Sequence, residues 1–323
     1  MAKKVIEIKS GADRYALAED ITNYSYLFGR SYTEERTRFY NFKTPTTMSF
    51  MFWENDTWND IDLSKYFSSS KGNMPTAAIS VDRICYVHNT MTSFKFPSGL
   101  KINDFQSAFQ GSNQSSLTID WNGIEICDLS ATAGPRFRNI FTSTAFSAMD
   151  MSGIVNSQTK PSDCYGAFNH NYYVVTYTMP PNLKVSNAYQ MFYNTRKLKT
   201  VNYNGMDTSA CTDFRAFHQS CWELEEFDGA NLQVLGTSAT LTQSMFNDCR
   251  ALKKVWIPKE WVIKATTAAQ SMFNGYNNTA GTLVIYTDAP ETTNGGQWGT
   301  YWKGAIPDSQ VVFGATHAQY ESA

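Results

Sequence analysis

Two groups of side chains have the types and spacing to do chemistry, and the first contains histidine and cysteine. His218 could act as a base for the thiol of Cys211 or Cys221, because a Cys–His pair can form an activated nucleophile. A catalytic thiol needs a polar, exposed setting, whereas both cysteines fall where a buried residue is expected. The pattern favours structural thiols. The four histidines form no H-x-x-x-H or H-E-x-x-H pair, so we expect no metal and no cofactor.

The second group is acidic and forms two short clusters. Paired carboxylates could serve a glycosidase, but the spacing of these residues on predicted strands or turns is more typical of a solvated face. No phosphate-binding glycine loop and no nucleophile elbow accompanies them, so we predict no catalytic residue. A glycan-cleaving enzyme built on Asp60 or Glu225 is the least favoured alternative. The clusters are Asp56, Asp60 and Asp62, and Glu223, Glu225 and Glu226.

The elements that position these groups are revealed by a repeated Phe that follows a small or aliphatic residue. Successive copies are separated by 24 residues (Phe28 to Phe52) to 32 residues (Phe109 to Phe141). One step is longer, from Phe52 to Phe109, and it can hold a degenerate copy around Tyr86. Such self-similarity marks stacked repeats with a continuous buried column. The column is predicted to contain Phe28, Phe52, Phe109, Phe141, Phe168, Phe192, Phe217, Phe246 and Phe273.

Each repeat has a helix-like half followed by a strand-like half. Ala188, Met191 and Phe192 stand at i, i+3 and i+4, which predicts a short helix before the Phe. Apolar residues then follow at the spacing F-x5-φ-x2-φ, where φ is apolar, and alternation over 198–203 and 252–257 predicts strands. Phe217 fits this pattern only with one extra residue before Leu224. The sequence therefore predicts an α/β repeat protein.

The repeat resembles BspA-type leucine-rich repeats. The resemblance rests on the spacing Phe246-x-x-Cys249-x-x-Leu252 and on an Asp-Thr-Ser step at Asp207, and it is most specific across 186–290. It implies a leucine-rich-repeat solenoid of about ten coils, with short parallel strands on one face and short helices on the other. We assign 1–20 to an N-terminal strand that caps the solenoid or docks as an arm, 21–290 to the solenoid, and 291–323 to a C-terminal cap.

Aromatic side chains are the weak candidates for binding. Rings on the open face of a solenoid can stack on sugars or anchor a protein partner. Trp298 and Trp302 are expected to fill the cap instead. The binding candidates are Trp261, Tyr203, Tyr177 and Trp256.

Composition limits the partners. Lys plus Arg number 27 against 29 Asp plus Glu, so no basic stripe suits nucleic acid. No apolar run reaches the roughly 20 residues that span a bilayer, and residues 1–10 do not form a secretory signal. BspA-type repeats occur in surface adhesins and phage virion proteins. We therefore predict a non-catalytic bacteriophage virion component, a tail fibre or surface protein made in the host cytoplasm.

This component would act in assembly or host attachment, since a solenoid offers an extended surface and no deep pocket. Its partners would be other virion proteins or copies of itself, together with a host surface protein or glycan. The alternative is a bacterial surface or cytoplasmic scaffold that binds protein or glycan.

Overall fold

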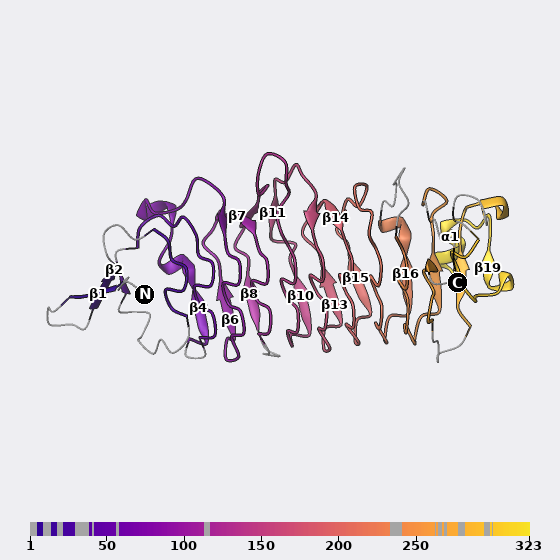
Figure 1. The fold of residues 1–323 in the computed structure, drawn as a ribbon, viewed down its shortest axis with the longest axis horizontal. Helices are drawn as coiled ribbons and strands as arrows, with labels where there is room; N and C mark the ends of the chain where they lie inside the picture. Colours follow the sequence, from indigo (N-terminus) through magenta and orange to yellow (C-terminus); the bar gives the residue numbers. More distant parts are fainter. Residues whose placement is uncertain are drawn as a thin grey trace.

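The chain winds into an elongated parallel β-solenoid of about eight turns, whose strands follow one another along the long axis (Figure 1). The computed structural model describes residues 5–8, 14–17, 22–29, 39–40, 42–55, 58–112, 117–232, 241–261, 263, 267, 270–276, 282–293, 298 and 300–323. The stacked repeat and the parallel pairing expected from the sequence are confirmed. The ten coils and the leucine-rich-repeat identity are not.

One wall of the solenoid consists of short parallel strands in three successive sheets, β4-β6-β8, β10-β13-β15 and β16-β17-β18-β19. Alternate side chains in them point inward, as in β13 and β16, whose middle residues alone are buried. The strands are β4 (Asp60–Asp62), β6 (Ser93–Lys95), β8 (Thr118–Asp120), β10 (Ala148–Asp150), β13 (Thr176–Thr178), β15 (Thr200–Asn202), β16 (Glu226–Asp228), β17 (Lys254–Trp256), β18 (Val284–Tyr286) and β19 (Val311–Val312).

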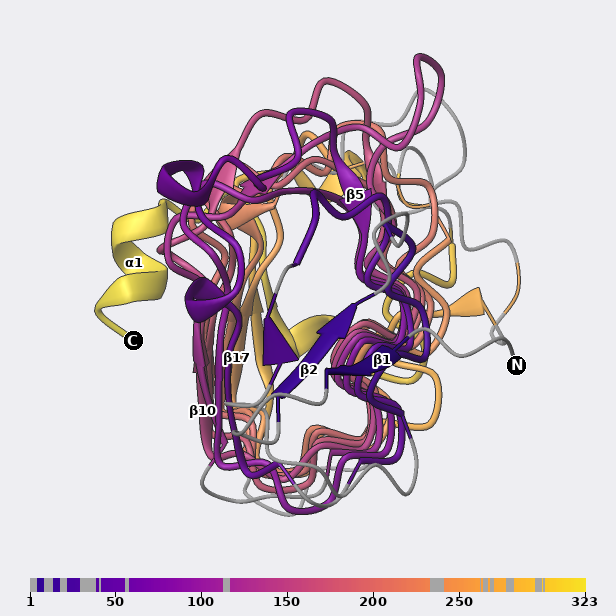
Figure 2. The same ribbon diagram turned by 90° about the vertical axis from the view of Figure 1, so that its left-hand side faces the viewer.

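Shorter parallel ladders form on another side of the coil, as the view along the axis shows for β5 opposite β10 and β17 (Figure 2). A separate sheet, β1-β2-β3, lies at the N-terminal end (Figure 1). The ladders contain β5 (Ile79–Ser80), β7 (Lys101–Asp104), β9 (Glu125–Ile126), β11 (Val155–Asn156), β12 (Ser162–Asp163) and β14 (Val185–Asn187), and the N-terminal sheet contains β1 (Val5–Ile8), β2 (Arg14–Leu17) and β3 (Phe39–Tyr40).

Helices are sparse, which corrects the expectation of a helical face. Among the described residues the only α-helix is α1 (His317–Glu321), which lies outside the wall that contains β10 and β17 (Figure 2). Single turns of 3-10 helix complete the described elements. They are η2 (Leu63–Lys65), η3 (Ser69–Lys71), η4 (Gly229–Asn231), η6 (Glu291–Thr293) and η7 (Asp308–Gln310).

The segments predicted to be helices are chains of tight turns. In the turn around Phe192, both Gln190 and Asn194 have positive φ, at 56° and 58°, and the same two positions are left-handed in most other turns. The amides of Gln190, Phe192 and Asn194 donate to carbonyls of the following turn at 2.7–3.0 Å, while the amides between them bond three residues back. A left-handed residue interrupts an α-helix. The i, i+3, i+4 spacing of the apolar residues therefore comes from consecutive tight turns and not from an α-helix.

A column of stacked rings runs through the core, and it corrects the register of one repeat. All nine predicted Phe residues are buried, and rings stack from Phe168 to Phe192 with centroids 5.4 Å apart. The next ring in the stack is the imidazole of His218, which lies 5.1 Å from Phe192 and 6.2 Å from Phe246 with interplanar angles of 7°. Phe217 instead meets Phe192 edge-on. Counted from His218, the spacing to Leu224 is the regular one, so this repeat contains no extra residue.

The ladder of backbone hydrogen bonds gives the same register. The amide of His218 donates to the carbonyl of Met245, as the amide of Phe192 donates to the carbonyl of Phe217. Cys85 occupies the equivalent place in the long step between Phe52 and Phe109, where its amide donates to the carbonyl of Ala108. The degenerate copy expected around Tyr86 is therefore centred one residue earlier.

At the C-terminal end, aromatic side chains close the core. Trp298 and Trp302 are fully buried and pack edge-on with centroids 4.8 Å apart, as expected for a cap. Strand β19 pairs in parallel with β18 and is the last strand of the sheet wall. Helix α1 begins with a capping box between Thr316 and Gln319 and then packs Tyr320 against Trp256.

Candidate functional site

A cleft lies where the sheet wall is interrupted between β15 and β16. These two strands belong to different sheets, although each pairs in register with its other neighbour. The opening has a volume of about 410 Å³. It brings together groups that are distant in the sequence: Lys199, Thr200, Val201, Tyr203, His218, Leu224, Glu225, Glu226, Phe227, Asp228, Asn231 and, from α1, Tyr320.

The floor of the cleft contains a hydrogen bond between two buried side chains. Tyr203 Oη and His218 Nε2 are 2.9 Å apart. Burial lowers the pKa of His218 to about 3 and raises the pKa of Tyr203 well above its usual value. Both groups are therefore neutral at pH 7. An imidazole with so low a pKa is a poor general base, because the best catalytic pKa lies near the operating pH.

The thiols of Cys211 and Cys221 are buried packing groups rather than nucleophiles. Cys221 Sγ lies 3.9 Å from His218 Nδ1 and 3.3 Å from the carbonyl oxygen of Phe192. Burial raises the pKa of Cys221 well above its usual value and that of Cys211 to about 12. A protonated thiol is a weak nucleophile, so the structural interpretation is favoured. All six cysteines are free and only Cys127 is partly exposed.

The acidic cluster at the cleft is matched by lysines on adjacent turns. A hydrogen bond from Lys253 lowers the pKa of Glu225, which keeps this carboxylate ionised rather than ready to donate a proton. Ion pairs at the surface of a protein contribute little to its stability. The pairs are Lys199–Glu223 at 3.8 Å, Lys253–Glu225 at 2.8 Å and Lys254–Glu226 at 3.2 Å.

The other acidic cluster lies far from the cleft, in the N-terminal part of the sheet wall. Asp62 accepts hydrogen bonds from the amide of Ser64 at 3.0 Å and from its hydroxyl, and so caps η2. Asp60 accepts a hydrogen bond from the hydroxyl of Ser93 on the next strand. Asp56 lies outside the described residues. The two clusters therefore do not form one site.

The four predicted aromatic binders are all buried, which corrects their assignment to the open face. Tyr177 points inward from β13 and receives a hydrogen bond from Asn171 at 2.6 Å, and Tyr203 points into the floor of the cleft. Trp256 is covered by α1. Trp261 is 1% exposed and packs where Gly229 has no side chain, since a Cβ on Gly229 would come within 2.8 Å of its ring.

Two aromatic side chains, the exposed Tyr172 and the half-buried Trp222, form a row with two arginines, which we call the cation–aromatic row. It consists of Tyr172, Arg196, Trp222 and Arg250, each four residues after the stacked ring of its own turn. The guanidinium carbon of Arg196 lies 4.9 Å from the ring centre of Tyr172 and 4.2 Å from that of Trp222. Arg250 lies 4.0 Å from Trp222. Four successive turns thus present one continuous ring–cation stack.

Sequence reasoning missed this row because the register of one repeat was displaced. With Phe217 taken as the stacked ring, Trp222 falls five residues later and the periodicity is lost. With His218 as the stacked ring, a spacing of four recurs through all four turns. Assigning His218 instead of Phe217 to the column of stacked rings would have revealed the row in the sequence.

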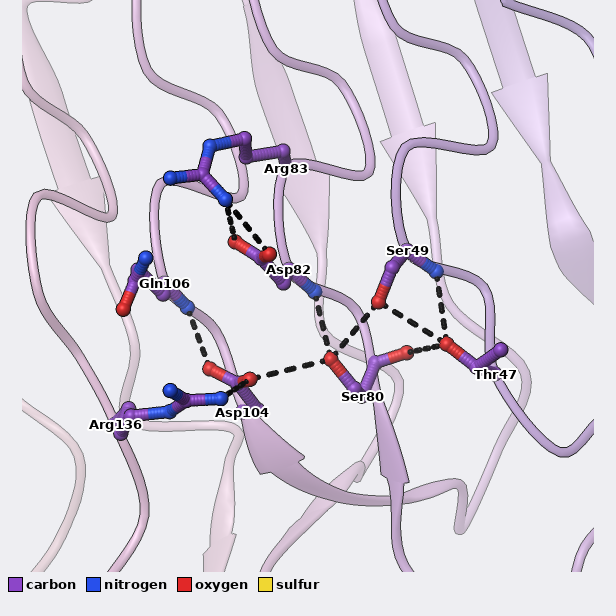
Figure 3. Close-up of polar contacts among 8 residues, drawn as sticks. All are labelled: Thr47, Ser49, Ser80, Asp82, Arg83, Asp104, Gln106 and Arg136. Carbon is purple, nitrogen blue, oxygen red and sulfur yellow. Dashed lines mark hydrogen bonds and ion pairs between the residues drawn. The ribbon is translucent and has the colours of Figure 1, made fainter. Parts of the chain in front are cut away.

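A second row of polar side chains belongs to the shorter ladders, and Figure 3 shows its N-terminal part. Ser80 Oγ lies 2.9 Å from Ser49 Oγ and 3.3 Å from Asp104 Oδ2, and Arg136 pairs with the same carboxylate. Ser80 also accepts from the amide of Asp82 at 3.2 Å, which fixes the start of a turn. These side chains pair with each other and with their own backbone, so we interpret the row as structural.

Comparison with known proteins gives one partial match. The model of a family described as "Mycoplasma protein of unknown function, DUF285" matches residues 163–284, which contain the cation–aromatic row and the residues that line the cleft except Tyr320. No curated protein and no solved structure matches the chain. Within the described part of the chain, no cluster of histidine, cysteine and acidic side chains could hold a metal ion, and no helix is long and apolar enough to cross a membrane.

Proposed function

We propose that the protein is a non-catalytic structural and recognition protein that contacts its partner through the cation–aromatic row. The row is the observation that carries this proposal. It repeats over four turns, it is partly exposed, and it holds rings and guanidinium groups in place before any partner arrives. Aromatic and Arg side chains dominate the energetics of protein interfaces, because they offer a large contact area at a low cost in entropy.

The chemistry of the cleft supports a binding role over catalysis. The imidazole of His218 has a pKa of about 3, the nearby thiols are protonated, and Glu225 is paired with Lys253. None of these groups is a base with a pKa near the operating pH, a thiolate or a protonated carboxylic acid, which are the groups that hydrolytic mechanisms use.

The setting that we propose is a bacteriophage particle, in which the protein is a tail-fibre or surface component that acts in assembly or host attachment. Its resemblance to BspA-type repeats supports this, as does a composition of low charge, with 17% charged and 15% aromatic residues in the whole chain. The partners would be other virion proteins or further copies of the chain, and a protein or glycan on the host surface.

The second candidate is a bacterial surface or cytoplasmic scaffold that binds protein or glycan. The match of residues 163–284 to a family described from Mycoplasma favours this alternative. Both candidates use the same surface, and they differ in where the protein is found.

Two measurements test the proposal. Mass spectrometry of purified particles, set against mass spectrometry of the cell envelope of the same bacterium, separates the two settings. Fluorescently labelled protein is then added to intact cells, with Trp222→Ala as the row variant and Arg138→Ala as the control. Arg138 is also half-exposed but pairs with Asp163 in the other row. We expect Trp222→Ala to weaken cell association and Arg138→Ala to leave it unchanged. Absence from particles and envelope together with no association of the wild-type protein refutes the proposal.

A further inference from the structure

Arg196 is the member of the cation–aromatic row whose charge is not paired with a carboxylate. Its guanidinium lies between the rings of Tyr172 and Trp222, and its Nε donates to Asn194 Oδ1 at 3.0 Å. No ion pair is formed by Arg196 with any described residue, whereas Arg250 in the same row pairs with Asp248 at 2.9 Å. The two stacked rings and the Asn194 contact fix the orientation of the guanidinium, and its terminal N–H groups have no acidic partner.

The charges around Arg196 favour a ligand with a single negative group at this point. Lys197 is exposed next to it, with its Nζ 6.0 Å from the ring centre of Tyr173, and Lys199 is paired with Glu223. Burial, and then the charge of Arg196, lowers the pKa of His170, so the imidazole is neutral at pH 7. The other cations of the neighbouring turns already have acidic partners, since Lys199 pairs with Glu223 and Arg250 pairs with Asp248, whose carboxylate also accepts a hydrogen bond from Trp222 Nε1 at 2.8 Å. A polyanion that continued along the row, such as a nucleic acid or a run of acidic residues, would therefore meet carboxylates beside these cations rather than a row of free positive charges.

A carboxylate fits this arrangement. A guanidinium presents a planar fork of N–H donors that matches the two oxygens of a carboxylate, and a fork already held by stacking loses little freedom on binding. Beside it, Tyr172 and Tyr173 are 38% and 54% exposed, and they supply ring surface on which the C–H face of a sugar can pack. A carboxylate attached to a sugar ring would use both features at once.

We propose that Arg196, with Tyr172 and Tyr173, is a binding site for the carboxylate of an acidic glycan. The inference rests on the proposed recognition function and deepens it, because it names the class of ligand and the residue that recognises its charge. Arg196 is the residue that determines specificity, and the remainder of the row holds it in position.

The test uses the full chain and a tetrasaccharide that contains glucuronate, with the same tetrasaccharide after reduction of its carboxyl groups to alcohols. Binding is measured by calorimetry, and saturation-transfer NMR reports which sugar protons contact the protein. The variants are Arg196→Lys and the matched control Arg215→Lys. Arg215 also lies over a ring, 4.7 Å from the centre of Tyr189, but pairs with Asp213 at 2.6 Å.

We expect the acidic tetrasaccharide to bind and its reduced form to bind at least about tenfold more weakly. Arg196→Lys should cause a comparable loss, since an ammonium keeps the charge but lacks the planar fork, while Arg215→Lys should change the affinity by less than about twofold. Both Lys variants keep the positive charge of the arginine they replace. Thermal midpoints equal to that of the wild-type protein would show that they are folded.

Four outcomes overturn the inference: equal binding of the reduced tetrasaccharide, unchanged affinity in Arg196→Lys, preferential binding of an oligoglutamate peptide, or no binding of the acidic tetrasaccharide at all. Cell association that is lost in Trp222→Ala but kept in Arg196→Lys leaves the proposed function standing while this inference fails.

Discussion

The buried imidazole of His218 should make the protein sensitive to acid, and replacing the pair that contains it should remove this sensitivity. The perturbation is the double change Tyr203→Phe and His218→Phe. A Phe at position 218 continues the stack between Phe192 and Phe246, whose rings lie within 7° of the plane of the imidazole. Changing Tyr203 as well avoids leaving its hydroxyl without the imidazole nitrogen 2.9 Å away.

The size of the effect follows from the pKa of His218, which burial lowers from 6.5 to about 3. Because the folded pKa lies below the unfolded one, the unfolded state takes up a proton first as the pH falls, and the folded state becomes less stable. At about pH 4.5 the pH is two units below the pKa of the imidazole in the unfolded chain, which is therefore protonated, whereas the imidazole in the folded protein is still neutral. Two units correspond to about 2.7 kcal/mol of unfolding free energy relative to pH 8.

The assay is urea unfolding of wild-type protein and double variant at about pH 8 and about pH 4.5, with the m-value checked for constancy. We expect the variant to lose about 2.7 kcal/mol less than the wild type between the two conditions, since the contributions of the remaining acids cancel in the difference. At pH 8 the two proteins should differ by less than about 1.5 kcal/mol. An equal acid-induced loss in both proteins would refute the reasoning, because His218 would then be protonated in the folded state.

Three further predictions concern the core, the thiols and the polar row. Phe168→Ala should lower the unfolding free energy by about 3–5 kcal/mol in urea titrations, because its ring is fully packed, and a loss under about 1 kcal/mol would contradict the stacked column. Mass spectrometry after maleimide treatment should find Cys127 modified in the native protein and all six cysteines modified after unfolding. Asp82→Asn should raise the thermal midpoint at about pH 8 but not at about pH 4. Burial raises the pKa of Asp82 from 3.8 to about 6, so folding opposes its ionisation and stability falls as the pH rises through that range. A gain of equal size at both pH values would show that ionisation is not the cause.

Local patterns in the sequence were sufficient to predict the core and the strands. The recurring Phe residues and the apolar residues six and nine positions after them are the side chains that pack inside the coil, and strands were found within 198–203 and 252–257 as β15 and β17. The prediction succeeded because alternation and apolar spacing are properties of one short segment. It failed for the helices, where Gln190 adopts a left-handed backbone conformation that its residue type does not favour, followed four residues later by Asn194, a type that enters this conformation more readily.

The sequence by itself determined that this chain is a stack of repeats with an aromatic interior and short parallel strands. Only the tertiary structure decided that the turns are not helices, that His218 completes the column, and that Trp261 and Trp256 are covered. It also placed Arg196 between two rings from neighbouring turns. The physical reason is the same in each case. These features depend on hydrogen bonds and packing between successive turns. The partners are 22 or more positions apart in the chain, and their contacts stabilise conformations that each segment would not adopt alone.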